Sequence, residues 1–320
     1  MTTHGEAERW HYLLGRFPKG RYIAVSFCFE NDAGILPSNS KFPSSVSTST
    51  GRPLPERPSP KLCRGGDSEP PLTIAHLLPD LLNLYGDRGN VTVLRMRCAW
   101  RSIPVSVFEC RRGDEIELPG VDVLFIGGGP DEKQRVAHER LMAMGGQIRG
   151  FVEEGGALLA ICGGFQMLGR SWVLDGKPVE GVGVFDAETR RATNARKRLV
   201  GDFALESPLS EAPVVGFENH AGRTFLAEGT QPFGRIISRC GHGNDERSRA
   251  DGAIHRNAIG TYAHGPLLSK NPEIADFLIA AGLERRAERT GFPASTLARI
   301  DDAEELAARA FMLGRMRLAR

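Results

Sequence analysis

The chain has 320 residues, of which 41% are hydrophobic, and its formal net charge is +2. This length can bury a full core, and the near-neutral charge argues against nucleic acid or an anionic membrane as the main partner. No apolar run approaches membrane-spanning length, no start resembles a signal peptide, and the six cysteines lack metal-type spacing, so we expect free thiols, no metal site and a cytoplasmic location.

The first 71 residues differ in composition from the rest. Residues 37–71 are rich in Ser, Pro, Gly, Thr and charged residues and have almost no periodic apolar pattern. Such a segment cannot bury enough surface to offset the entropy that it would lose on ordering. We therefore predict a disordered extension over residues 1–71, or a start codon assigned too far upstream. Within it, residues 22–29 could form a short strand, but they have no obvious partner.

From Ile74 onward, short apolar strands alternate with helices. Residues 103–108, 121–126 and 157–161 are predicted strands, and residues 132–144 and 148–154 are predicted helices. Residues 185–217 should add antiparallel strands. Residues 272–282 and 301–318 should form closing helices, the last with Leu306, Ala310 and Leu313 as its apolar stripe. The alternation predicts a mostly parallel, doubly wound sheet in one domain over residues 72–320.

An apolar run of strand length ends at Cys162, two glycines follow, and a segment with helical spacing then begins. A cysteine on such a turn is presented outside the backbone, and the N–H groups at the start of a helix favour its thiolate, which is the nucleophile. The glycines tolerate positive φ and leave room for a substrate. This thiol version of the nucleophile elbow favours catalysis over the alternative, a buried structural cysteine at a strand end.

Cysteine catalysis needs a histidine that is close in space. His264 ends a predicted strand at residues 258–263 and precedes Gly265 and Pro266. A strand-end histidine lies on the rim of an open α/β sheet, where sites form. His220, which follows a short strand at residues 214–217, is the alternative, and either could be an ordinary hydrogen-bonded loop histidine. We predict that His264 is the base.

A second glycine-rich turn, residues 127–130 (GGGP), follows the strand predicted at residues 121–126. It could cradle a phosphate, but it lacks the Lys-Ser/Thr of a P-loop and the spacing of a dinucleotide fingerprint. Glycine amides beside a nucleophile suit an oxyanion hole better. We predict that the N–H of Gly128 or Gly129 supplies one donor and the N–H of Gly163 the other.

Five short segments occur in an order that is typical of one known family. They are residues 79–90 (PDLLNLYGDRGN), 125–130 (FIGGGP), 161–166 (ICGGFQ), 216–224 (GFENHAGRT) and 260–268 (GTYAHGPLL), followed by residues 270–272 (KNP). With them the chain, from Ile74 to its end, resembles the class I, triad-type glutamine amidotransferases of the cobyric-acid-synthase-like branch. The first seventy or so residues lie outside the resemblance.

The resemblance implies both a fold and a reaction. The fold is a flavodoxin-like three-layer α/β/α sandwich with a mostly parallel sheet, in which Cys162 and His264 face each other across the strand ends. The reaction is hydrolysis of L-glutamine to glutamate and ammonia. Cys162 would attack the side-chain amide, and His264 would protonate the departing ammonia and then activate water against the thioester.

The same resemblance implies that the arginine before a Leu-x-Gly-Asp segment recognises glutamine. Here that residue is Arg198, with Arg196 as the alternative because the local spacing is longer by a couple of residues. An arginine suits a bidentate grip on the α-carboxylate. We also expect Gln166, in the same segment as the nucleophile, to bind the substrate.

Within the family, the chain is similar to the glutaminase subunits of lipid II isoglutaminyl synthases. This similarity implies a heterodimer with a MurT-type, Mur-ligase-like synthetase. That partner would use ATP and Mg to activate the D-glutamate carboxylate of lipid II, so that ammonia from this chain gives D-isoglutamine. The chain itself would need no cofactor.

One departure from the family pattern concerns the third catalytic residue. Triad amidotransferases usually have an acidic residue two positions after the histidine, and here that position is Pro266. Either the chain works as a dyad, or an acid comes from elsewhere in this chain, with Glu218 as the first candidate, or from the partner.

Three other functions remain open. A cobyrinate-type glutaminase would carry a fused synthetase domain with a P-loop, and no P-loop motif occurs in this sequence. A stress or hydrolase protein with an elbow cysteine in a similar sandwich gives no reason for residues 261–266 (TYAHGP). A non-catalytic subunit that only stabilises a synthetase would not need both Cys162 and His264.

Overall fold

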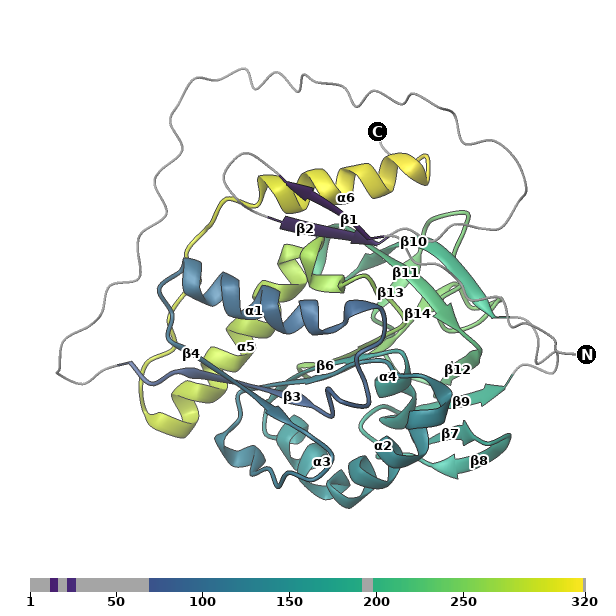
Figure 1. Ribbon diagram of the computed structural model, residues 1–320, viewed down its shortest axis with the longest axis horizontal. Helices are drawn as coiled ribbons and strands as arrows, with labels where there is room; N and C mark the ends of the chain where they lie inside the picture. Colours follow the sequence, from purple (N-terminus) through teal and green to yellow (C-terminus); the bar gives the residue numbers. More distant parts are fainter. Residues whose placement is uncertain (1–11, 17–21, 27–68, 192–197, 319–320) are drawn as a thin grey trace, which may run out of the picture.

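The computed structural model describes residues 12–16, 22–26, 69–191 and 198–318 (Figure 1). Near the beginning of the chain, β1 (Tyr12–Arg16) pairs with β2 (Tyr22–Ser26) in antiparallel register. Residues 22–26 of the strand expected at residues 22–29 form β2, and they have a partner that the sequence did not indicate. Residues 27–29 lie outside the described residues. Apart from β1, β2 and residues 69–71, the predicted disordered extension lies outside the described residues.

A six-stranded sheet forms the centre of the described chain, in the order β15-β16-β6-β5-β3-β4. All neighbours from β16 to β4 are parallel, and only β15 is antiparallel to its neighbour. Every residue of β5 and β6 is buried, as expected for strands covered on both faces. The strands are β3 (Leu72–Leu77), β4 (Val105–Cys110), β5 (Val123–Ile126), β6 (Ala157–Ile161), β15 (Ala253–His255) and β16 (Ala258–Thr261).

Helices cover both faces of this sheet (Figure 1). One layer contains α1 (Arg88–Trp100) and α5 (Pro272–Thr290), and the other contains α2 (Asp131–Ala143), α3 (Gly145–Glu153) and α4 (Gly163–Met167). Short 3-10 helices lie at Leu84–Gly86, Leu118–Gly120 and Leu267–Ser269. The predicted three-layer α/β/α sandwich with a mostly parallel sheet is confirmed.

The helix expected at residues 272–282 continues to Thr290, so its predicted end at Gly282 is wrong. Gly282 lies where α5 packs closely on the sheet, because a Cβ there would come within 2.6 Å of Val123 Cγ2. The helix ends at Gly291, whose φ of 72° is the left-handed conformation that glycine adopts without strain.

Two smaller four-stranded sheets extend the sandwich, in the orders β11-β10-β13-β14 and β12-β9-β7-β8. They include the antiparallel strands expected after residue 185. The strands are β7 (Ser171–Leu174), β8 (Lys177–Glu180), β9 (Ala187–Arg191), β10 (Leu199–Ser207), β11 (Ser210–His220), β12 (Gly222–Leu226), β13 (Gly234–Ile236) and β14 (Ala250–Asp251).

The last helix, α6 (Ala303–Arg315), packs against β11 with a face that includes only part of the predicted stripe. Its buried residues are Arg309, which is paired with Glu273 of α5, and Met312, which lies in a small apolar cluster. Leu306 is 43% exposed. The predicted stripe is therefore wrong at Leu306 and Ala310, which are exposed, whereas Leu313 is partly buried and packs against the same cluster as Met312.

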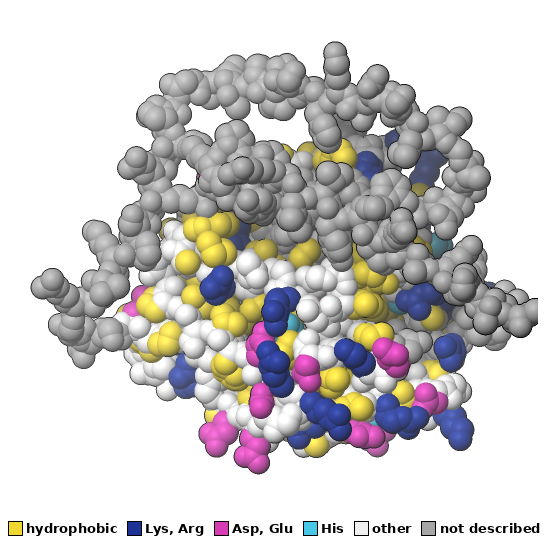
Figure 2. All heavy atoms as spheres, viewed as in Figure 1, with side chains coloured by type: hydrophobic (Ala, Val, Ile, Leu, Met, Phe, Trp, Pro, Cys, Tyr) yellow, Lys and Arg dark blue, Asp and Glu magenta, His cyan; other side chains and the backbone are white. Residues whose placement is uncertain are grey.

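The surface mixes acidic and basic side chains, as the near-neutral charge suggests. Figure 2 shows them interspersed over the lower half of the face that it presents. Several form ion pairs, such as Arg88 and Arg111 with Glu109. Among the described residues, no helix has the combination of length and apolar character that crossing a membrane requires.

Candidate active site

Cys162 stands on the sharp turn between β6 and α4. Its φ of 51° and ψ of −106° are unusual for a residue with a side chain, a kind of strain that concentrates at functional sites. Its N–H donates to the Thr261 carbonyl on β16 over 2.8 Å, which fixes the turn. Gly164 packs closely against the neighbouring turn, since a Cβ on Gly164 would lie 2.9 Å from the Gly127 carbonyl oxygen. The predicted elbow is therefore present, and Cys162 lines a pocket of about 260 Å³.

His264 follows β16 and is fully buried near the cysteine, since a Cβ on Gly128 would lie 3.0 Å from His264 Cε1 and 3.3 Å from Cys162 Cβ. Among the described residues, Nε2 of His264 has no hydrogen-bond partner. Its backbone N–H donates to the Phe217 carbonyl over 2.9 Å, which anchors the histidine to β11. Burial opposes the charged imidazole, but the Asp87 carboxylate and Cys162 outweigh burial and raise the pKa of His264 well above 6.5. The fold therefore favours an imidazolium that faces Cys162.

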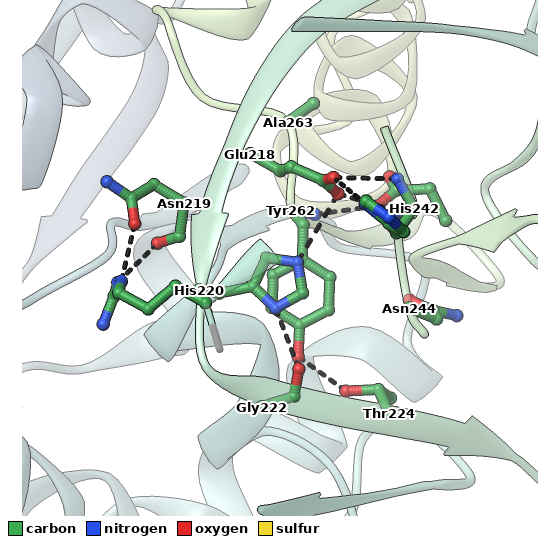
Figure 3. Close-up of polar contacts among 12 residues, drawn as sticks. Glu218, Asn219, His220, Gly222, Thr224, His242, Asn244, Tyr262 and Ala263 are labelled. Atoms are coloured by element: carbon green, nitrogen blue, oxygen red, sulfur yellow. Dashed lines mark hydrogen bonds and ion pairs between the residues drawn. The ribbon is translucent and has the colours of Figure 1, made fainter. Parts of the chain in front are cut away.

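His220, the alternative base, is held in a different way. Its Nδ1 donates to the Gly222 carbonyl over 2.9 Å, and its Nε2 lies 3.6 Å from a carboxylate oxygen of Glu218. Its ring stacks on Tyr262 with 3.6 Å between centroids (Figure 3). Of the two candidate histidines, the structure brings His264 to Cys162.

The carboxylate that orients His264 comes from Asp87, which sequence reasoning did not single out. Nδ1 of His264 lies 3.2 Å from Asp87 Oδ1, and both side chains are fully buried. Glu218, the first candidate in this chain, instead accepts hydrogen bonds from His242 and the Gly243 N–H (Figure 3). Asp87 does lie in one of the five family-like segments, between two glycines and after a strand of the central sheet. That position in the sequence is the signal by which Asp87 could have been predicted as the orienting acid.

Contacts of Asp87 also distinguish Gly128 from Gly129, the two candidate glycines for one donor of the oxyanion hole. Its Oδ2 accepts the Gly128 N–H over 2.8 Å, so this donor is already used. The Gly129 nitrogen lies 3.5 Å from where a Cβ on Gly163 would be, which places the N–H groups of Gly129 and Gly163 on neighbouring backbone. Of the predicted donors, Gly129 and Gly163 fit an oxyanion hole, and Gly128 fits a structural role.

Arg198 and Gln166 both line the pocket that contains Cys162. Arg198 donates from Nε to Asn219 Oδ1 and from Nη2 to the Asn219 carbonyl, each over 2.7 Å. Asn219 in turn donates to the Tyr85 hydroxyl over 2.7 Å, and the Tyr85 ring packs edge-on against His264. The guanidinium is thus fixed relative to the histidine. The alternative, Arg196, lies outside the described residues.

Comparison with known proteins agrees with this geometry. Residues 73–272 match the CobB/CobQ-like glutamine amidotransferase domain family. A relative from Staphylococcus aureus (strain N315), the lipid II isoglutaminyl synthase (glutamine-hydrolyzing) subunit GatD, is 40% identical over 76% of this chain and 96% of its own length. The GatD subunit of Streptococcus pneumoniae (strain ATCC BAA-255 / R6) is 37% identical over 67% of this chain and 82% of its own length.

A third relative is matched over a smaller share of both chains. It is the cobyric acid synthase of Listeria innocua serovar 6a (strain ATCC BAA-680 / CLIP 11262), 35% identical over 45% of this chain but only 28% of its own length. The matched part of that larger protein and the two GatD subunits share one kind of domain with this chain. The chain therefore belongs to the CobB/CobQ-like glutamine amidotransferase family.

Proposed function

We propose that this protein is the glutaminase subunit of a lipid II isoglutaminyl synthase. It hydrolyses L-glutamine and supplies ammonia to a MurT-type, Mur-ligase-like synthetase, which amidates the D-glutamate of the lipid II stem peptide to D-isoglutamine. The two relatives named GatD support this choice, because the similarity covers 96% and 82% of their lengths. A cobyrinate-type function has weaker support, since the matched cobyric acid synthase is covered over only 28% of its length.

In the proposed reaction, the Cys162 thiolate attacks the side-chain amide carbon of glutamine. The N–H groups of Gly129 and Gly163 stabilise the negative oxygen of the tetrahedral intermediate. The His264 imidazolium gives a proton to the departing ammonia, which leaves a thioester on Cys162. Neutral His264 then takes a proton from water, and the resulting attack releases glutamate and restores the thiolate.

Arg198 is the proposed clamp for the α-carboxylate of the substrate. Asn219 uses N–H groups of Nε and Nη2, so the substrate would meet the remaining donors on Nη1 and Nη2. The Nε edge of the guanidinium faces the protein, so the bidentate grip would use its Nη1–Nη2 edge. A charged donor pair that is already fixed loses little freedom when the carboxylate binds.

One observation carries the proposal. The cysteine on the elbow lies near a buried histidine, which is held in turn by a buried aspartate, and all three lie beside the pocket that Arg198 lines. A nucleophile, a base and an orienting acid in this order form the arrangement that cysteine-dependent acyl transfer needs. Each of the three comes from a different part of the chain.

The test replaces the nucleophile and supplies ammonia separately. We expect Cys162→Ala to abolish ammonia release from glutamine, while free ammonium still supports lipid II amidation by the complex with the synthetase. Cys240→Ala is the matched control, because Cys240 is an exposed free cysteine that does not line the pocket. More than a few per cent of glutamine-dependent activity in Cys162→Ala would show that the nucleophile lies elsewhere.

A further inference from the structure

Behind the pocket, a chain of buried hydroxyl groups connects two of its walls. Gln166 Nε2 donates to the Tyr262 hydroxyl over 3.0 Å, and this hydroxyl lies 2.6 Å from Thr224 Oγ1. Thr224 Oγ1 lies 2.8 Å from Thr189 Oγ1. Gln166 and Thr189 line the pocket of Cys162, whereas Tyr262 and Thr224 are buried and do not line it. Figure 3 shows the contact between Tyr262 and Thr224.

The ring of Tyr262 is fixed on both sides. His220 stacks on it almost in parallel, with an interplanar angle of 12°, and Phe165 meets it edge-on at 5.5 Å. Tyr262 also lies two residues before His264, on backbone that Asp251 anchors through the Tyr262 N–H. The hydroxyl therefore has one direction available, toward Gln166 and Thr224.

The absence of a side chain at Gly222 leaves space for the Gln166 carboxamide beside the linked hydroxyl groups. A Cβ on Gly222 would lie 2.4 Å from Gln166 Nε2 and 2.8 Å from Thr189 Cγ2. Thr189 and Thr224 are themselves a directly opposed pair between β9 and β12. Two strands and the glycine after His220 thus hold the carboxamide of Gln166 against Tyr262.

The Tyr262 hydroxyl oxygen accepts an N–H of Gln166. In the two hydrogen bonds that join the hydroxyl groups of Tyr262, Thr224 and Thr189, either oxygen can be the donor. Among the described residues, Tyr262 is the only hydrogen-bond partner of the Gln166 carboxamide, so Oε1 of this carboxamide remains for a molecule in the pocket.

We infer that Tyr262 and Thr224 are positioning residues for substrate binding, which hold Gln166 with its carboxamide oxygen toward the pocket as a hydrogen-bond acceptor. This inference rests on the proposed function, since glutamine is the substrate considered. Arg198 takes the carboxylate, and Gln166 Oε1 accepts from an N–H donor of the same molecule. That donor is either the α-ammonium group or the side-chain amide, and both are present in glutamine.

The test measures glutamine affinity without turnover. In a Cys162→Ala background, we expect Thr224→Val to weaken L-glutamine binding by about tenfold in calorimetry, the size expected for one lost positioning hydrogen bond. Thr224→Ser keeps the hydroxyl and should bind within about twofold of the parent protein. Tyr262→Phe keeps the ring and its stacking and should weaken binding as Thr224→Val does. Thr230→Val, which alters a partly exposed threonine outside the pocket, should leave glutamine binding unchanged.

With Cys162 present, Thr224→Val should raise KM for glutamine and leave kcat unchanged, because no group that touches the reacting atoms is altered. L-glutamate identifies the donor. A loss shared by glutamine and glutamate points to the α-ammonium group, and a loss confined to glutamine points to the side-chain amide. If Thr224→Val and Tyr262→Phe both bind glutamine as the parent does, the inference is overturned but the proposed function is not. No glutamine binding by the parent itself would overturn the proposed function and this inference together.

Discussion

Asp87 joins two parts of the active site with one side chain. Its Oδ1 meets Nδ1 of His264, and its Oδ2 holds the Gly128 N–H of the oxyanion turn. The aspartate therefore fixes the tautomer and orientation of the base, and it also fixes the backbone that presents Gly129. Because it lies in this chain, the orienting acid need not come from the synthetase.

We predict that Asp87→Asn lowers glutamine turnover about 100-fold or more, since an asparagine favours the wrong tautomer of the histidine. KM should change little. The Asp87 carboxylate raises the pKa of His264, so the alkaline limb of the kcat/KM profile should move to lower pH in the variant.

The measurement compares turnover and pH profile, alone and with saturating synthetase. Asp80→Asn, an exposed aspartate in the same family-like segment, is the control and should behave as wild type. Wild-type turnover by Asp87→Asn in the complex would show that a carboxylate of the partner, and not Asp87, orients His264.

Among the elements, the elbow between β6 and α4 depends on close backbone contact. A Cβ on Gly164 would lie 2.8 Å from Ile126 Cγ2 and 2.9 Å from the Gly127 oxygen. We predict that Gly164→Ala destabilises the protein by about 1–3 kcal/mol, as overpacking does, and reduces turnover by shifting Cys162. Gly146→Ala, in the open on α3, should instead stabilise by about 0.5–1 kcal/mol. Urea unfolding measures both, and equal stability of the two variants would contradict the packing argument.

In β14, the side chain of Asp251 is fully buried. Burial raises the pKa of Asp251 to about 7, although hydrogen bonds from Thr261 and the Tyr262 N–H favour its charged form. Between pH 4 and 7 the native state keeps this proton and the unfolded chain releases it. This group therefore stabilises the fold fully only below its unfolded pKa, and that contribution is lost as pH rises to 7.

Asp251→Asn should remove this part of the pH dependence of stability, which amounts to about 4 kcal/mol between pH 4 and 7, because a shift of one pKa unit corresponds to about 1.36 kcal/mol. Unfolding by urea at pH 5, 6 and 8 measures it. The stability of the variant relative to wild type should increase from pH 5 to pH 8, and a constant difference would contradict the assignment. Asp80→Asn again provides the matched exposed control.

At the scale of the whole molecule, the packed chain begins slightly before the predicted boundary at residue 72. The fully buried guanidinium of Arg286 on α5 donates to the Pro70 carbonyl over 2.9 Å and lies 2.8 Å from a carboxylate oxygen of Glu69. A buried charge needs such partners. Residues 69 and 70 therefore belong with the domain rather than with the extension.

We predict that a chain beginning at Glu69 has the same melting temperature as the full chain and pairs equally well with the synthetase. A chain beginning at Leu72 should lose about 1–3 kcal/mol, because Arg286 then lacks both partners. Thermal unfolding of the two shortened chains is the comparison. A loss of several degrees in the chain that begins at Glu69 would show that the first 68 residues pack on the domain.

The sequence by itself determined the features that local physics controls. Apolar runs of strand length, helical spacing and a cysteine followed by two glycines each need only a few neighbouring residues. They were sufficient to predict the central sheet, the elbow at Cys162 and the strand-end position of His264. The glycines at 128, 129 and 163 were also recognisable, because a tight turn beside a nucleophile needs them.

Only the tertiary structure decided which distant side chains meet. Asp87 and His264 are 177 positions apart, and they meet because β3 and β16 run parallel in one sheet, so that their carboxyl ends share an edge. The same packing lets Asp87 accept the Gly128 N–H and lets Tyr262 accept from Gln166. It also pairs Arg309 of α6 with Glu273 of α5. Such contacts depend on strand order and side-chain direction, which the periodicity of a single sequence does not encode.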